Sequence, residues 1–249
     1  MGRLGGRVVV VTGAGAGIGR ACTERYVSEG AVVVAADRDE ASLDALQGEM
    51  GSSIRTATCD VTAPTHAATL VTAAHDAFGR LDVFHANAGG ALPMPFEEVD
   101  ASAYEHIRSL NLDAAWHAAQ AAMPVFATAG RGVFLVTSSG AGSAAVRGLA
   151  AYGAAKAGVQ ALVRSLAIEY GPHGVRSCAI SPGPIESPGL LAWLDTQPGG
   201  SASYAADKVM RRLGRPAEIA AAAAFLASDD ASFVNGVTLP VDGGALAAL

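Results

Sequence analysis

The chain has 249 residues, of which 51% are hydrophobic and 16% are charged. These proportions exclude a disordered or fibrous protein, and a chain of this length buries enough surface to fold without a disulfide or a structural metal. The formal net charge is −6 and the chain contains no run of basic residues, which argues against a nucleic-acid partner.

Short apolar runs alternate along the chain with longer stretches of helical periodicity. Runs that are apolar throughout are typical of parallel strands buried on both faces. Strands are predicted at 8–11, 31–36, 83–86, 133–136 and 175–180, and helices at 18–29, 40–50, 64–78, 101–127 and 152–170. The alternation predicts an α/β fold with an open, doubly wound parallel sheet and helices on both of its faces.

One stretch departs from this alternation. Residues 181–212 are rich in Pro, Gly and Ser and form a longer connection than two neighbouring elements need. Loops of this length usually have a function. We expect residues 1–249 to form a single domain, with a substrate lid over about residues 184–212.

A glycine-rich turn follows the first predicted strand and leads into the first predicted helix. Backbone N–H groups and the positive end of that helix favour a pyrophosphate at this position. Glycine is required because a Cβ would block either the turn or the phosphate. The residues expected to contact a dinucleotide here are Gly13, Gly15, Ala16, Gly17, Ile18 and Gly19.

Asp37 ends the second predicted strand, at the distance from the glycine turn that a dinucleotide site requires. A carboxylate there accepts hydrogen bonds from both ribose hydroxyls and repels a 2′-phosphate. Arg38 follows and offers such a phosphate a positive charge, but the glycine turn contains no basic residue. With Asp37 and Arg38 both at the cofactor, we predict that NAD(H) is preferred over NADP(H).

Tyr152 and Lys156 lie four residues apart on one face of a predicted helix. A nearby ammonium lowers the pKa of a phenol, which makes tyrosine a usable acid and base for alcohol–ketone exchange. Ser139 follows the strand at 133–136, where open α/β sheets bind ligands. We expect its hydroxyl to hold the substrate oxygen beside Tyr152.

From residue 7 to residue 244 the sequence resembles the classical short-chain dehydrogenases/reductases. The motifs that carry the resemblance stand in family order: Thr12, Gly13, Gly17 and Gly19; Asp60-Val61; Asn87-Ala88-Gly89; Asn111; Ser139; Tyr152 and Lys156; Pro182-Gly183; and Val241-Asp242-Gly243-Gly244. The resemblance implies a Rossmann-type NAD(P)-binding domain and an oxidoreductase that acts on CH–OH groups.

The resemblance also implies a role for each catalytic position. Tyr152 is the general acid and base, and Ser139 orients and polarises the carbonyl. Lys156 lowers the pKa of the tyrosine and binds the nicotinamide ribose. Asn111 anchors a water that relays protons from Lys156 to solvent.

Further cofactor contacts follow from the same resemblance. Asp60 and Val61 are expected beside the adenine. The remaining contacts are Asn87, Ala88 and Gly89, together with Pro182, Gly183, Ile185 and Ser187 near the nicotinamide. Ser187 stands where the family usually has threonine, and it retains the hydroxyl group that holds the carboxamide.

The expected pocket walls, at 90–94, 141–149 and 185–194, are mostly apolar, with Arg147 and Glu186 as their charges. This composition favours a neutral, mainly hydrophobic secondary alcohol or ketone, unless Arg147 points inward and binds an anion. One alternative is a 3-oxoacyl-thioester reductase of the acyl-carrier-protein type. Two observations oppose it. Asp37 disfavours NADPH, which such reductases usually prefer, and the surface available for docking a carrier protein supplies only Arg131 and His173 as basic residues. The other alternative is a non-catalytic dinucleotide-binding regulator, which the retained catalytic residues oppose.

Three cysteines lie far apart without a CxxC pair, and the histidines show no metal-binding spacing, so we expect no disulfide and no metal. The N-terminus lacks the apolar core of a signal peptide, and the longest apolar run, 219–227, is too short to span a bilayer. We expect a cytoplasmic protein without a membrane partner. Alanine-rich faces on the helices at 101–127 and 152–170 and the apolar tail 245–249 predict a homotetramer.

Overall fold

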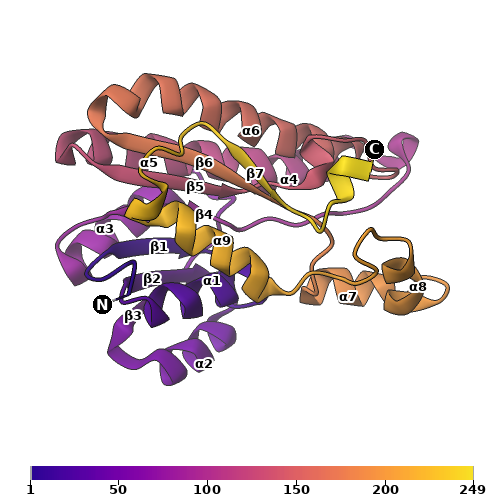
Figure 1. Ribbon diagram of the computed structural model, residues 1–249, viewed down its shortest axis with the longest axis horizontal. Coiled ribbons are helices and arrows are strands. Elements are labelled where there is room, and N and C mark those ends of the chain that lie inside the picture. The colour runs from indigo at the N-terminus through magenta and orange to yellow at the C-terminus, as the bar shows by residue number, and fades with distance from the viewer. Residues whose placement is uncertain (1, 249) are drawn as a thin grey trace.

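The computed structural model describes residues 2–248 and contains one seven-stranded parallel sheet (Figure 1). The strands are β1 (Val8–Thr12), β2 (Val32–Asp37), β3 (Ile54–Thr58), β4 (Val83–Ala86), β5 (Gly132–Thr137), β6 (Val175–Pro182) and β7 (Thr238–Val241). Their order is β3-β2-β1-β4-β5-β6-β7. The predicted doubly wound α/β fold is confirmed, because the chain winds outward in both directions from the neighbouring strands β1 and β4.

The two strands that periodicity did not predict form the edges of the sheet. β3 reads Ile-Arg-Thr-Ala-Thr, and only Ile54 is fully buried. An edge strand has one neighbour and needs no continuous apolar run. The residues of β7 are half-buried or exposed, and only the family resemblance at Val241 indicated this strand.

Helices cover both faces of the sheet (Figure 1). One face carries α1 (Gly17–Ser28), α2 (Glu40–Met50) and α9 (Pro216–Ala227), and the other carries α3 (His66–Phe78), α5 (Ala114–Ala129) and α6 (Ala150–Tyr170). In β1, Val9 and Val11 pack on the α1 side, while Val8 and Val10 pack on the α6 side. Among the described residues, no helix has the length and apolarity needed to cross a membrane.

The single helix predicted over residues 101–127 is wrong in one respect. The structure has α4 (Ala101–Arg108), then a π-helical turn at Ser109–Asp113, and then α5. Within that turn, the Asn111 side chain donates from Nδ2 to the carbonyl oxygen of Ile107 at 2.9 Å. An amide that bonds a carbonyl four residues earlier competes with the regular helical ladder, and π turns are common at functional sites.

The long connection after β6 folds into two short helices, α7 (Pro188–Leu194) and α8 (Gly200–Ala206), beyond the carboxyl ends of the strands (Figure 1). The rings of Trp193 and Tyr204 meet edge to face at 6.0 Å, and Lys208 Nζ lies 3.9 Å from the centre of the Tyr204 ring. Backbone hydrogen bonds join Gly214 to Pro184 and Glu186. Residues 184–214 therefore form an ordered excursion, whose two ends are joined by these hydrogen bonds where it leaves and rejoins the rest of the domain.

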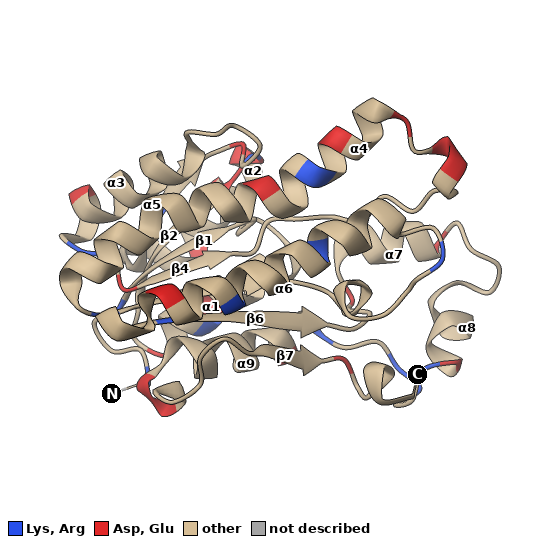
Figure 2. Ribbon diagram, turned by 90° about the horizontal axis from the view of Figure 1, so that it is seen from above, with Lys and Arg blue, Asp and Glu red and all other residues tan. Residues whose placement is uncertain are grey.

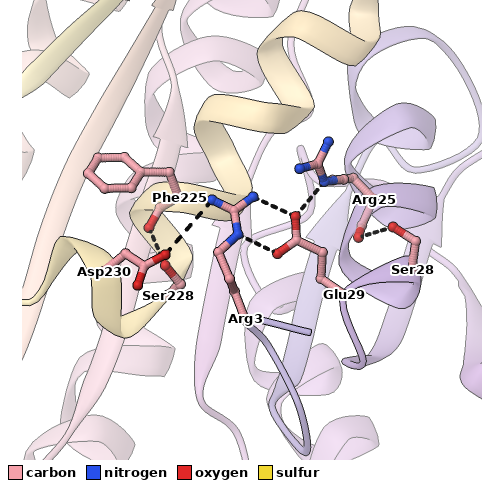
Figure 3. Close-up of polar contacts among 7 residues, drawn as sticks. All are labelled: Arg3, Arg25, Ser28, Glu29, Phe225, Ser228 and Asp230. Atoms are coloured by element: carbon pink, nitrogen blue, oxygen red, sulfur yellow. Dashed lines mark hydrogen bonds and ion pairs between the residues drawn. The ribbon is translucent and has the colours of Figure 1, made fainter. Parts of the chain in front are cut away.

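An ion-pair network ties the N-terminal segment to the end of α1 and to the turn after α9 (Figure 3). Arg3 donates to both oxygens of Glu29, from Nε at 2.7 Å and from Nη2 at 2.5 Å. Arg25 Nε reaches the same carboxylate at 2.5 Å, and Arg3 Nη1 lies 4.0 Å from Asp230. The hydrogen bond from Arg3, more than that from Arg25, lowers the pKa of Glu29 to about 2.

Because folding lowers this pKa, the charged network stabilises the protein above the ordinary range of a glutamate, and that contribution is lost as the pH falls toward about 2. We expect Glu29→Gln to lower the free energy of unfolding at neutral pH by about 1–2 kcal/mol and to flatten its decline in acid. Urea unfolding across pH measures both effects. Glu24→Gln, which removes the ion pair between Glu24 and Arg20 within α1, is the matched control and should change little, because 43% of the Glu24 side chain is exposed. Equal effects of the two substitutions would contradict this account.

Candidate active site at the carboxyl edge of the sheet

The glycine turn between β1 and α1 is shaped to receive a phosphate. Gly13 and Gly17 have φ values of 68° and 53°. A Cβ on Gly19 would lie 1.9 Å from the Gly13 carbonyl oxygen, so no other residue fits there. Ala16, the residue before α1, makes no side-chain cap, which leaves the first N–H groups of the helix available to a ligand. The predicted cradle for a pyrophosphate therefore fits the backbone.

Asp37 closes one side of this turn. Its Oδ2 accepts the Gly15 N–H at 2.9 Å, and its Oδ1 accepts the Asp39 N–H at 3.1 Å. Arg38 is exposed, and its positive charge acts on Asp60, whose pKa is lowered chiefly by hydrogen bonds from Thr62 and to a smaller extent by Arg38. Two further acids, Asp39 and Glu40, give this end of β2 a negative surface.

The chain after β4 is fastened to the end of β1. Thr12 Oγ1 accepts the backbone N–H groups of Asn87 and Ala88, each at 3.0 Å. The Asn87 side chain donates from Nδ2 to the Thr12 carbonyl at 3.0 Å. A Cβ on Gly13 would lie 3.2 Å from this Nδ2, so Asn87 stands directly behind the glycine turn.

Lys156 is buried, with 3% of its surface exposed, and its Nζ donates to the Thr137 carbonyl at 2.9 Å. Burial lowers the pKa of Lys156 to about 8. The ammonium lies 5.6 Å from the centre of the Tyr152 ring. The structure therefore brings together the tyrosine and lysine that their spacing predicted to share a helix face.

Burial dominates the pKa of Tyr152 and raises it, while the Ser139 side chain lowers it by a smaller amount. Lys156 is not among the groups that shift this pKa. The lowering of the tyrosine pKa by Lys156 therefore stays a prediction, while desolvation of the phenol raises that pKa in this structure. The Ser139 Oγ is fixed by the N–H of Ala141 at 3.2 Å.

The Asn111 side chain is fully engaged. Its Oδ1 accepts the Gly90 N–H at 3.0 Å, and its Nδ2 donates to the carbonyls of Gly90 and Ile107. Beside it lies a cavity of about 10 Å³, lined by Thr12, Asn111 and Lys156 together with His66 and apolar residues. That volume is at the lower limit for one water molecule, and the lining offers it several polar partners.

Gln160 is a buried residue that the sequence analysis missed. Its Nε2 donates to Ser138 Oγ at 3.1 Å and to the Ser139 carbonyl at 3.3 Å, and its Oε1 accepts from Ser143 at 3.2 Å. The signal was a glutamine one helical turn after Lys156, which places it on the helix face that carries Tyr152 and Lys156. Together these bonds hold the loop that carries Ser139.

The residues after β6 border the same edge. Gly183 donates its N–H to the Val241 carbonyl at 3.1 Å, and a Cβ on Gly183 would lie 2.8 Å from the backbone of Asp242. Ile185 is buried. The Ser187 hydroxyl, expected at the carboxamide, here accepts the Leu190 N–H at 3.4 Å and begins α7.

Comparison with known proteins gives consistent matches along the chain. A family model described as enoyl-(acyl carrier protein) reductase matches residues 13–245. The cis-4-hydroxycyclohexanecarboxylate dehydrogenase of Sinomonas cyclohexanicum is 40% identical, and the match covers 96% of each chain.

Two solved structures share the fold along almost their whole length. Levodione reductase superposes with a TM-score of 0.94 at 32% identity, covering 98% of this chain and 99% of that one. The 3-ketoacyl-(acyl-carrier-protein) reductase from Brucella melitensis, complexed with NADH, gives a TM-score of 0.89 at 32% identity, with 97% and 99% covered.

Proposed function

We propose a substrate and a cofactor for this chain, which belongs to the family of short-chain dehydrogenases/reductases and is thus an NAD(P)-dependent oxidoreductase of CH–OH groups. It interconverts a mainly hydrophobic secondary alcohol and its ketone. NAD(H) is the proposed cofactor, and Tyr152 is the proposed acid and base. The observation that carries the proposal is the meeting of Tyr152, Lys156 and Ser139 beside the glycine turn at one edge of the sheet.

In the proposed mechanism the bound nicotinamide supplies or accepts the hydride. Ser139 donates a hydrogen bond to the carbonyl oxygen, and Tyr152 transfers its phenolic proton to that oxygen during reduction and takes it back during oxidation. The Lys156 ammonium stabilises the phenolate that this transfer leaves. Lys156 also holds the nicotinamide ribose. A water in the cavity beside Asn111 and Lys156 returns the proton to the site.

Tyr152→Phe removes the transferable proton and keeps the ring that fills the site. We expect the turnover number to fall by at least ~10²-fold, the usual contribution of a positioned acid or base, with nucleotide affinity nearly unchanged. Steady-state kinetics and nucleotide titration of the same preparation measure the two quantities. Near-normal turnover in this variant would overturn the assignment of Tyr152.

The remaining cofactor contacts are proposed on the geometry of the cradle. The pyrophosphate is held by the residues of the glycine turn, from Gly13 through Gly15, Ala16, Gly17 and Ile18 to Gly19. The adenosine half lies between Asp37, Arg38, Asp60 and Val61, and the nicotinamide half lies between Asn87, Ala88 and Gly89 and the segment that contains Pro182, Gly183, Ile185 and Ser187.

NAD(H) is proposed over NADP(H) because the Asp37 carboxylate already holds the glycine turn and faces the place of the ribose diol. Asp39 and Glu40 add negative charge there, so a 2′-phosphate would meet three carboxylates against the single cation of Arg38.

We expect at least a ~10-fold higher kcat/KM with NAD(H) than with NADP(H), and a smaller difference in Asp37→Ala. Kinetics with both cofactors test this, with Asp44→Ala, which removes an exposed carboxylate farther along α2, as the matched control. A preference of the unmodified protein for NADPH would contradict the proposal.

The proposed substrate is neutral and mainly hydrophobic. Leu92 and Val146 expose 45% and 50% of their surface on two loops that a hydrogen bond from Met94 to the Gly148 carbonyl joins beside the start of α6. Apolar walls favour apolar ligands by about 25 cal/mol per Å² buried. We propose that the excursion with α7 and α8 is the lid that covers this ligand. A hydroxycyclohexane ring in the name of a 40% identical relative supports an alicyclic substrate.

A carboxylated substrate is the second candidate, because that relative's name also contains a carboxylate. Arg147 lies between Ser139 and Tyr152 in the chain and is exposed. Within residues 2–248 no carboxylate forms an ion pair with it. It is therefore the cation in the substrate loops that remains available for an anionic group.

The two candidates differ in a direct comparison of an alkyl-substituted cyclohexanone with the matched cyclohexanone carboxylate. We expect a higher kcat/KM for the neutral ketone and a ratio that Arg147→Ala changes by less than about twofold. Arg131→Ala is the control, because Arg131 precedes β5 and so lies at the amino ends of the strands, away from the substrate loops. A preference for the carboxylate that disappears in Arg147→Ala would reject the neutral substrate.

A thioester reductase is a less favoured reading, although a solved relative carries the name 3-ketoacyl-(acyl-carrier-protein) reductase. Arg131 and His173, the basic residues considered for docking a carrier protein, precede β5 and β6 and so lie at the amino edge of the sheet, away from Tyr152. A non-catalytic regulator is opposed by the assembled Tyr152–Lys156 pair. Turnover of any ketone would exclude it.

We propose that four copies of the chain associate. α5 contains no Lys, Arg, Asp or Glu (Figure 2), and Trp116 on it is 51% exposed. Ile168 on α6 and Phe233 after α9 are 79% and 102% exposed. Large apolar side chains in such positions are typical of subunit contacts.

Light scattering after size exclusion should give four times the chain mass, and a monomer at micromolar concentration would contradict the proposal.

A further inference from the structure

A tyrosine and a histidine are buried together beneath the nucleotide site and take no part in the mechanism above. Tyr26 on α1 and His85 on β4 are each 0% exposed, and the tyrosine hydroxyl lies 2.9 Å from His85 Nδ1. His85 Nε2 lies 3.0 Å from Thr137 Oγ1. Two polar side chains in an apolar core are costly unless every polar atom has a partner, so their hydrogen bonds are informative.

The direction of each bond follows from one carbonyl group. The Thr12 carbonyl can only accept, so the Asn87 atom 3.0 Å from it is the amide nitrogen. The other amide atom, Asn87 Oδ1, therefore faces Thr137 Oγ1 at 2.9 Å. An amide oxygen cannot donate, so the Thr137 hydroxyl donates to Asn87.

The same reasoning fixes the histidine. Since the Thr137 proton is used on Asn87, His85 Nε2 carries a proton and donates to Thr137 Oγ1. Burial lowers the pKa of His85 to about 3, so the ring is neutral and Nδ1 is an acceptor. The Tyr26 hydroxyl donates to it. All the bonds therefore run one way, from Tyr26 through His85 and Thr137 to Asn87 and Thr12.

Both halves of the active site meet this chain of bonds at Thr137. Its hydroxyl holds Asn87, which stands behind the glycine turn at Gly13. Its carbonyl accepts the Lys156 ammonium at 2.9 Å. A disturbance of Thr137 therefore reaches the nucleotide cradle and the catalytic lysine together.

We propose that Tyr26 and His85 are positioning residues, which orient Thr137 and Asn87 and thereby set the nucleotide cradle and Lys156. The Thr12 carbonyl fixes the His85 tautomer with its proton on Nε2, and the Tyr26 hydroxyl satisfies the other ring nitrogen and holds the ring in place. Without that hydroxyl, Nδ1 has no partner in the core, and the ring is free to turn away from Thr137. Thr137 then loses the bond that orients its hydroxyl toward Asn87.

The decisive variant is Tyr26→Phe/His85→Leu, which replaces both polar partners with apolar groups of similar size. Removing both members of a buried pair together is nearly neutral for stability, so the fold should persist. We expect its thermal midpoint to stay near that of the wild type. The dissociation constant for NADH, measured by fluorescence titration without substrate, should rise about fivefold to tenfold, the equivalent of one hydrogen bond, and kcat should fall.

Two single substitutions sharpen the test. His85→Gln retains an acceptor for Tyr26 and a donor for Thr137, and should bind NADH within about twofold of the wild type. Tyr26→Phe should weaken binding, and ¹⁵N spectra of the histidine ring should show a change at Nδ1, which loses its hydrogen-bond donor, while the proton stays on Nε2. Tyr170→Phe is the matched control, because Tyr170 also faces a histidine ring, at 6.3 Å from His173, but lies far from the site.

A folded double variant with wild-type NADH affinity and kcat would overturn the proposal, since the pair would then only fill the core. Loss of affinity in His85→Gln equal to that in the double variant would also overturn it. If the double variant does not fold, Tyr26→Phe decides, and an unchanged affinity for NADH overturns the proposal. If the wild type binds NADPH more tightly than NADH, that result refutes the proposed cofactor preference but not the positioning role of Tyr26 and His85. The same variants are then compared with NADPH.

Discussion

The hydrogen bond from the Lys156 ammonium to the Thr137 carbonyl is the constraint on which the proposed chemistry depends. An ammonium that is almost closed to water is stable only with a partner, because an unpaired buried charge costs several kcal/mol. The last carbonyl of β5 supplies that partner at 2.9 Å. α6 must then lie against this strand end, and Tyr152, one helical turn earlier, is placed beside the loop that carries Ser139.

The parallel sheet makes this arrangement possible. Thr12, Asn87 and Thr137 are far apart in the sequence, but each lies at or just beyond the carboxyl end of a strand, and β1, β4 and β5 are neighbours. Side-chain hydrogen bonds join the three residues across the strand ends. In the proposed function, nucleotide binding and proton transfer therefore share one rigid base, while the excursion with α7 and α8 supplies the part that differs between substrates.

Much of this was predictable from the sequence, and what was not has physical causes. The inner strands were predicted because burial on both faces requires apolar runs, whereas the edge strand β3 is polar and escaped notice. The π turn at Asn111 was missed because a helical pattern does not show where a side chain will displace a backbone bond. Gln160 and His85 were missed because their partners are fixed by register and packing. The raised pKa of Tyr152 could not be predicted for the same reason, since desolvation is a property of the folded protein.

The pH dependence of ketone reduction tests most directly whether the buried Lys156 ammonium completes the proton-transfer site. Burial lowers the pKa of Lys156 to about 8, so the ammonium is present below that pH and lost above it. Measured at saturating NADH and ketone, kcat should be level at lower pH and should fall as the pH rises through about 8, with an apparent pKa that belongs to the Tyr152–Lys156 pair. A kcat that stays level well above that pH would contradict the account.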